Sequence, residues 1–119
     1  MITIDIFQDE ENTDDFSVGQ TIFKEGEPGE LMYVVQKGEV DIVVGDQVVE
    51  TIGPGGMLGE MALIDASARS ASAVAKTDCK LVPLDVVRFQ IHVENTPHFA
   101  IQVIRVLAER LRRMTEQMS

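Results

Sequence analysis

Short β-forming segments, separated by turns that contain glycine, follow one another through most of the chain between residues 16 and 84. Many short strands with a turn signal every several residues are typical of a sandwich or barrel of the jelly-roll kind. The helix-forming residues at 60–63 interrupt this series and favour a single helical turn there. The expected strands cover residues 21–23, 31–35, 40–44, 48–52, 72–75 and 80–84.

Two helices are expected after the last strand. Asp85 is a suitable N-cap for a short helix that continues through residues 89–93. Pro97 follows the cap-like pair Asn95-Thr96 and occupies the first position of a second helix, which should extend to about Gln117.

These elements predict a mainly β fold with terminal helices. The core would be a double-stranded β-helix, which is a jelly-roll or cupin-like β-roll, followed by a short helix and a long C-terminal helix. We expect an acidic N-terminal segment over residues 1–15, in which a short apolar start leads into a linker. The β-roll would then span residues 16–96 and the C-terminal helix residues 97–119.

Apolar residues repeat at spacings of four and three along the predicted C-terminal helix and form one stripe. The stripe could pack on the β-roll, or it could form a seam against the same helix of a second copy in a homodimer. With barely three heptads, the pattern leaves both interpretations open. The residues of the stripe are Ala100, Ile104, Leu107, Leu111, Met114 and Met118.

Length and composition indicate a single globular domain. A chain of 119 residues can bury a core of its own, and Cys79 is its only cysteine, so no internal disulfide is possible. No apolar run approaches the roughly 18 residues of a membrane span, and the acidic N-terminus does not resemble a signal peptide. We therefore expect a cytoplasmic protein.

The net charge of −10 is concentrated in the first half of the chain. Residues 1–60 contain 14 acidic and 2 basic side chains, whereas residues 61–119 contain 6 acidic and 8 basic ones. This balance argues against a broad nucleic-acid footprint, and the basic tail is better explained as a solvated helix face. That tail contains Arg105, Arg110, Arg112 and Arg113.

Residues 55–71, with the sequence GGMLGEMALIDASARSA, combine small residues with Glu60 and Arg69, whose charged groups suit a phosphorylated sugar. The Arg69 guanidinium matches the edge of a phosphate, and an ionised Glu60 only accepts hydrogen bonds, which suits a hydroxyl. Each residue also has a plainer explanation. Arg69 could be a surface residue paired with Glu60, and Ser70 could simply begin a strand.

Three segments in this order and spacing resemble the cyclic nucleotide-binding domain family. They are residues 19–22 with Glu25-Gly26-Glu27, residues 32–35 with Gly38-Glu39-Val40, and residues 55–71; the resemblance extends over about residues 16–114. It implies a β-roll that binds a cyclic nucleotide, with cyclic AMP favoured over cyclic GMP. It implies no metal and no other cofactor.

The resemblance also implies roles for individual residues. Glu60 would accept a hydrogen bond from the ribose 2′-hydroxyl, Arg69 would pair with the cyclic phosphate, and Ser70 would donate to a phosphate oxygen. Gly59 would let the ribose approach. Backbone amides of Met61, Ala62 and Ala71 would complete the cradle.

The chain departs from the family pattern at two positions. Leu58 replaces the usual aromatic residue before the Gly-Glu pair, and Ala68 replaces the usual proline before the arginine, which loosens the local backbone. Leu58 and Val40 could line the ribose and base pocket or be plain core. Thr115 could reach the base, or it could be a solvated residue at the helix end.

Catalysis is not expected. Cupin-type enzymes need clustered histidine and carboxylate ligands on strands, whereas His92 and His98, the only histidines, belong to the predicted helices. Cys79 has no histidine nearby, and no pair of nucleophile and base is apparent.

We expect a small regulatory sensor that binds a cyclic nucleotide and signals through its C-terminal helix to an unknown effector protein. No nucleic-acid binding, membrane attachment or output domain is expected in this chain. The alternative is a β-roll that binds no ligand and acts as a dimerisation or docking domain.

Overall fold

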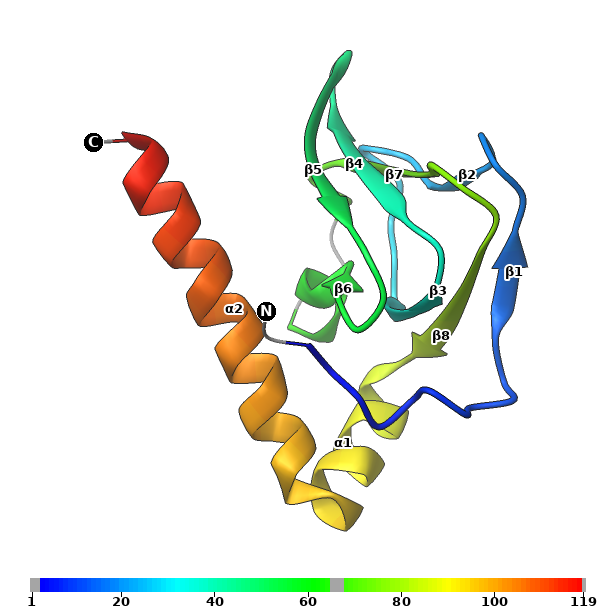
Figure 1. The fold of residues 1–119 in the computed structure, drawn as a ribbon, viewed down its shortest axis with the longest axis vertical. Helices are drawn as coiled ribbons and strands as arrows, with labels where there is room; N and C mark the ends of the chain where they lie inside the picture. Colours follow the sequence, from blue (N-terminus) through cyan, green and yellow to red (C-terminus); the bar gives the residue numbers. More distant parts are fainter. Residues whose placement is uncertain (1–2, 65–67, 119) are drawn as a thin grey trace.

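Two antiparallel four-stranded sheets and two helices make up the computed structural model, which describes residues 3–64 and 68–118 (Figure 1). The first sheet has the order β1-β8-β3-β6, with β1 Asp14–Phe16, β8 Cys79–Leu84, β3 Met32–Lys37 and β6 Met57–Leu58. The second has the order β2-β7-β4-β5, with β2 Thr21–Phe23, β7 Ser72–Ala75, β4 Val40–Val44 and β5 Gln47–Ile52. A single 3₁₀ turn, η1, spans Glu60–Leu63, and the helices are α1, Val86–Asn95, and α2, Pro97–Met118. The predicted fold class is confirmed.

Strand β3 is the centre of the molecule because both of its faces are buried. Side chains alternate along a strand, so Met32 and Val34 point to one side and Tyr33 and Val35 to the other. The first pair joins an apolar cluster with the helices, which includes Phe99, and the second pair joins the cluster between the two sheets. The continuous apolar sequence of this strand follows from that double burial.

Residues 3–15 are more than the apolar start and linker that were expected, because they add to the core and to a sheet. Ile4 and Phe7 are buried in the cluster that packs against the helices, and strand β1 begins at Asp14 and pairs antiparallel with β8. Strand β1 has only three residues, two of them aspartates, and so shows no strand pattern in the sequence. It is identified only by its pairing with β8. Strand β6 escaped prediction for the same reason, since it has two residues and lies beside β3.

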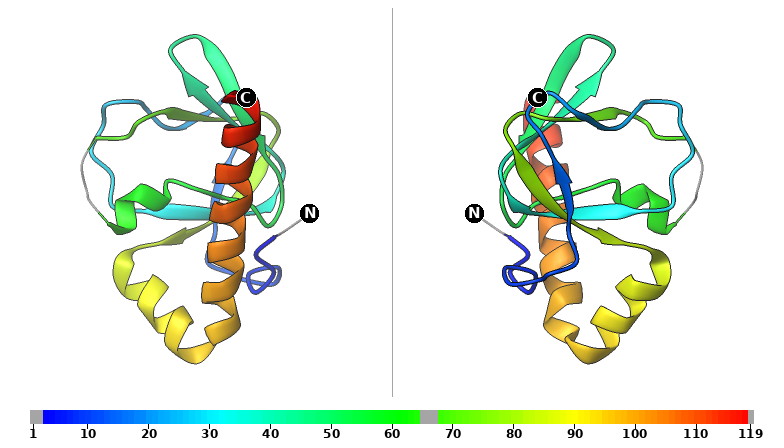
Figure 2. Two further views of the ribbon diagram at one scale, coloured as in Figure 1. Left: turned by 90° about the vertical axis from the view of Figure 1, so that its left-hand side faces the viewer. Right: turned by 90° about the vertical axis from the view of Figure 1, so that its right-hand side faces the viewer.

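Asp85 caps α1 as predicted. Its side chain accepts a hydrogen bond of 2.8 Å from the Arg88 N–H. Helix α2 begins at Pro97, and Figures 1 and 2 show that α1 and α2 meet in a V at one end of the molecule, from which α2 rises beside the sheets.

Replacing Asp85 with alanine should lower the free energy of unfolding by about 1 kcal/mol, because the Arg88 N–H would lose its partner. Thermal or urea unfolding measures this loss. Asp85→Ser is the matched control, since its hydroxyl can accept the same hydrogen bond. If alanine and serine gave equal stability, the cap would contribute nothing.

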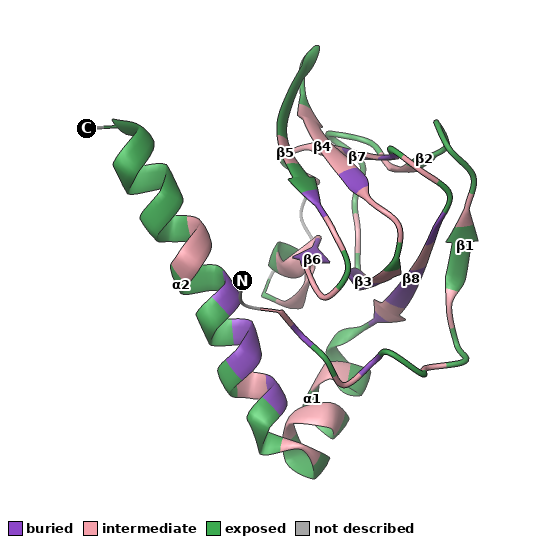
Figure 3. Ribbon diagram, viewed as in Figure 1, coloured by how far each residue is buried: buried purple, intermediate pink, exposed green. Residues whose placement is uncertain are grey.

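The apolar stripe on α2 does not pack on the sheets. The residues that α2 buries lie near its start and are Phe99, Gln102, Val103 and Val106. Beyond them the helix is mostly exposed, as Figure 3 shows, and Leu111 and Met114 are 64% and 54% exposed. The packing interpretation of the stripe is therefore wrong for this chain on its own. No helix among the described residues is long and apolar enough to cross a membrane.

Candidate functional site

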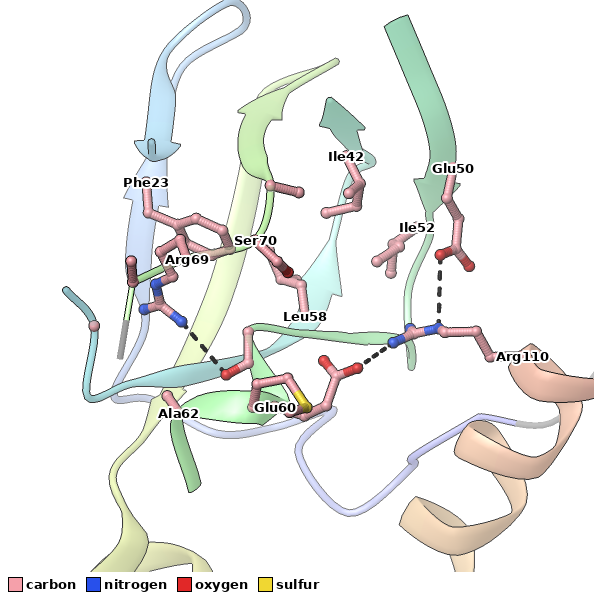
Figure 4. A pocket seen from close by; sticks show the side chains of 15 residues that line it. Phe23, Ile42, Glu50, Ile52, Leu58, Glu60, Ala62, Arg69, Ser70 and Arg110 are labelled. Carbon is pink, nitrogen blue, oxygen red and sulfur yellow. Dashed lines mark hydrogen bonds and ion pairs between the residues drawn. The ribbon is translucent and has the colours of Figure 1, made fainter. Parts of the chain in front are cut away.

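A cavity of about 330 Å³ opens where the second sheet, η1 and α2 approach one another (Figure 4). Its walls come from five parts of the chain: β2 and the loop after it, β4 and β5, the segment from β6 to η1, the residues before β7, and α2. The lining residues are Phe23, Gly29, Ile42, Glu50, Ile52, Leu58, Gly59, Glu60, Met61, Ala62, Ala68, Arg69, Ser70, Ala71 and Arg110.

All seven residues predicted to bind a ligand line this cavity, and so does Leu58. Val40 is not among the lining residues and is fully buried between the sheets. Thr115 is exposed near the end of α2, where its hydroxyl donates a hydrogen bond of 3.0 Å to the Leu111 carbonyl oxygen. The structure thus gathers the predicted cradle in one place and leaves Val40 and Thr115 outside it.

Gly59 forms the bend between β6 and η1. Its φ of 74° lies in the left-handed region, which glycine adopts without the steric cost that other residues incur. A Cβ atom at this position would lie 2.8 Å from Nη1 of Arg69 and 3.1 Å from the Leu31 carbonyl oxygen. Gly59 is therefore required both for the turn and for the close approach of Arg69. The Ala62 N–H, which was expected to be free for a ligand, donates to the Gly59 carbonyl oxygen at 3.1 Å.

Glu60 is paired with Arg110 of α2 and not with Arg69. Nη1 of Arg110 donates to Oε1 of Glu60, and Nη2 donates to the Met57 carbonyl oxygen at 2.9 Å. On the other side, Nε of Arg110 is 3.6 Å from Oε2 of Glu50. The interpretation of Arg110 as part of a solvated basic face is wrong, because it neutralises two carboxylates at the cavity wall.

Arg69 is held at the opposite side of the cavity by backbone oxygens and an aromatic ring. Nη2 donates to the Leu31 carbonyl oxygen at 2.8 Å, and Nη1 approaches the Gly59 carbonyl oxygen at 3.4 Å. The guanidinium carbon lies 4.1 Å from the centre of the Phe23 ring, a cation–π arrangement. Burial lowers the pKa of Arg69, while Tyr33 and Glu27 oppose that effect.

No carboxylate of the described residues forms a salt bridge with Arg69, and its buried Nε has no hydrogen-bond partner among them. A guanidinium remains protonated in proteins, so Arg69 presents a positive charge at the cavity wall that lacks a counterion among the described residues. Such a group suits an anionic ligand with several acceptor oxygens.

Seven lining residues were not predicted from the sequence: Phe23, Gly29, Ile42, Glu50, Ile52, Ala68 and Arg110. Alternation along β4 and β5 would have placed Ile42 and Ile52 on the inner face. The same alternation places Glu50 on the face of Ile52, but nothing local identifies Arg110 as its partner, since the two meet only when α2 lies beside β5.

No group of three or more His, Cys, Asp or Glu side chains that could hold a metal ion occurs within residues 3–64 and 68–118. Burial raises the pKa of the Cys79 thiol, which disfavours the reactive thiolate. His92 packs edge-on against Phe7, at 4.9 Å between ring centres.

The family model described as cyclic nucleotide-binding domain matches residues 13–94. The chain is 46% identical over 74 residues to the cAMP-dependent protein kinase regulatory subunit of Eremothecium gossypii, a match that covers 62% of this chain and 16% of that protein.

Among solved structures, catabolite activator protein of Thermus thermophilus has a TM-score of 0.73 at 32% identity, covering 90% of this chain and 54% of that one. A protein solved in work on a cyclic-GMP-dependent signalling pathway that regulates bacterial phytopathogenesis has a TM-score of 0.69 at 31% identity, covering 87% of this chain and 84% of that one. The chain thus spans 16% of the kinase subunit's length and about half of the Thermus protein's.

Proposed function

The chain belongs to the cyclic nucleotide-binding domain family, and on that basis we propose that it is a regulatory module that binds a cyclic nucleotide in the cavity between Arg69 and Glu60. The observation that carries the proposal is Arg69, a cation without a counterion among the described residues, at the wall of a cavity that also presents a carboxylate. A cyclic phosphodiester supplies the missing negative charge, and its ribose supplies the 2′-hydroxyl as a hydrogen-bond donor.

Arg69 and Glu60 bind different groups of the ligand because one donates hydrogen bonds and the other accepts them. Arg69 and the Ser70 hydroxyl donate to phosphate oxygens, while Glu60 accepts from the ribose 2′-hydroxyl. Arg110 contacts Oε1 of Glu60, and among the described residues nothing donates to Oε2, so this oxygen remains available. The apolar side chains of Ile42, Ile52 and Leu58 then offer a surface for the base.

Local charge matters because the whole chain carries a net charge of −10, which repels an anion. Arg69 provides a focused positive charge inside a partly enclosed cavity, whereas the charge of Arg110 is offset by Glu50 and Glu60. The cavity also has the size typical of small-molecule sites, which begin at about 300 Å³.

Isothermal titration with cyclic AMP, cyclic GMP and linear 5′-AMP tests the proposal. We expect one site per chain for a cyclic nucleotide, with cyclic AMP bound more tightly than cyclic GMP, and weaker binding of the linear compound. The kinase relative is named for cyclic AMP, whereas one structural relative comes from work on a cyclic GMP pathway. The titration therefore needs both nucleotides. If neither cyclic compound bound, the docking-domain alternative would replace this function.

Helix α2 is the proposed output element, since Arg110 ties it to Glu60 in the cavity. A ribose on Glu60 changes the surroundings of Arg110 and so the anchoring of α2, which biases its arrangement. Hydrogen exchange should report a change in protection around Arg110 when cyclic AMP is added. Equal protection in both states would exclude this route.

The exposed stripe on α2 supports a homodimer through this helix. Leu111→Ala should raise the dimer dissociation constant about tenfold, because Leu111 would lose apolar burial while alanine keeps the helix stable. Sedimentation equilibrium measures the constant. Ile91→Ala on α1 is the control, since Ile91 is also exposed but lies off the stripe. A monomeric parent, or equal constants for both variants, would contradict this dimer.

A further inference from the structure

The loop between β2 and β3 is bonded to the backbone of Arg69, although about forty residues separate them in sequence. The Arg69 N–H donates to the Glu27 carbonyl oxygen at 2.8 Å, and the Gly26 N–H donates to the Arg69 carbonyl oxygen at 2.9 Å. Pro28 and Ala68 form an isolated β-bridge beside these bonds. Ala68 lacks the rigidity of proline, and these contacts supply the missing restraint from outside the segment.

The same stretch of chain also surrounds the guanidinium of Arg69. Phe23 lies under it and the Leu31 carbonyl oxygen accepts from it. Gly29 lies against it so closely that a Cβ atom at Gly29 would overlap Nε, Cζ and Nη2 of Arg69. Gly29 is not among the glycines with positive φ, so alanine would fit its backbone and would conflict only with the Arg69 side chain.

We propose that Phe23 and Gly29 are positioning residues that set the guanidinium of Arg69 in place before any ligand arrives. Gly29 provides the space and Phe23 provides the surface on which the group lies. An arginine fixed in this way loses less conformational freedom on binding an anion than one that is free in solution, and this raises affinity. The inference rests on the proposed function only for the identity of the ligand.

Gly29→Ala tests the role of the space. We expect the affinity for cyclic AMP to fall about tenfold, because the guanidinium must leave its present position. Gly53→Ala is the matched control, since Gly53 also lacks a positive φ and a Cβ atom there would meet nothing within 4 Å. Phe23→Leu is the second variant and should weaken binding about threefold, because it removes the aromatic face but keeps an apolar side chain.

A cycle with Arg69→Ala separates positioning from a structural effect. Alanine lacks every Arg69 side-chain atom with which the new Cβ would overlap, so Gly29→Ala should cost no further affinity in that background. An equal cost in both backgrounds would overturn the proposal.

Nuclear magnetic resonance gives a readout that needs no nucleotide. The Arg69 side chain lies over the Phe23 ring, so its Nε–H and neighbouring CH₂ resonances should be shifted by the ring current. Gly29→Ala and Phe23→Leu should move them toward ordinary values, whereas Gly53→Ala should not. Shifted resonances in a parent that binds no cyclic nucleotide would support the positioning and refute the proposed function. Unshifted resonances in the parent, or resonances unchanged by Gly29→Ala, would refute the positioning.

Discussion

Replacing Arg69 with alanine should weaken cyclic AMP binding by roughly 30- to 3000-fold. The loss of one partner from a desolvated charge pair costs about 2–5 kcal/mol, and each 1.4 kcal/mol is tenfold in affinity. The fold should persist, because no described carboxylate depends on Arg69 for neutralisation. Its hydrogen bond to the Leu31 carbonyl oxygen would be lost at a cost of about 1 kcal/mol of stability.

Titration calorimetry on the parent and the variant measures this effect, with thermal unfolding alongside. Arg105→Ala is the matched control, since it removes the same charge from an exposed position on α2 outside the cavity. Binding equal to that of the parent in Arg69→Ala would mean that the phosphate does not lie at Arg69, and the assignment of residues 59–71 to a ligand cradle would fail.

Glu60→Gln should weaken cyclic AMP binding by roughly 10- to 150-fold. A hydrogen bond to a charged group contributes about 1.5–3 kcal/mol, and an amide oxygen is a weaker acceptor than a carboxylate. The variant also removes one negative partner of Arg110, so part of the effect could arise from a changed position of α2. The experiment therefore needs a ligand variant as well as a protein variant.

The ligand variant is 2′-deoxy cyclic AMP, which lacks the hydroxyl proposed to bind Glu60. The parent should bind it much more weakly than cyclic AMP, while Glu60→Gln, whose amide oxygen is a weaker acceptor, should discriminate less between the two compounds. Glu50→Gln controls for the effect through Arg110, since Glu50 is its other carboxylate neighbour. A parent that bound both compounds equally would place the ribose away from Glu60.

Local patterns were sufficient for most of the β-roll and for the cradle. The strand at residues 40–44 has apolar β-formers and is bounded by glycines, and the cap at Asp85 depends on a hydrogen bond only three residues away. The segment from Gly59 to Ala71 was recognisable because its glycine, carboxylate and guanidinium lie close together in the chain. By contrast, β1 and β6 are too short for any periodicity and exist through pairing with β8 and β3.

The sequence by itself determined the fold class, the family and the two charged residues of the cavity, since each depends on neighbouring residues or on the order of short segments along one chain. The tertiary structure alone decided that Arg110, fifty residues after Glu60, is the partner of that carboxylate, and that Phe23 and Gly29 lie against Arg69. It also decided that the stripe on α2 is exposed. Charge and apolarity show what a side chain can bind, but the path of the chain determines which group lies within reach.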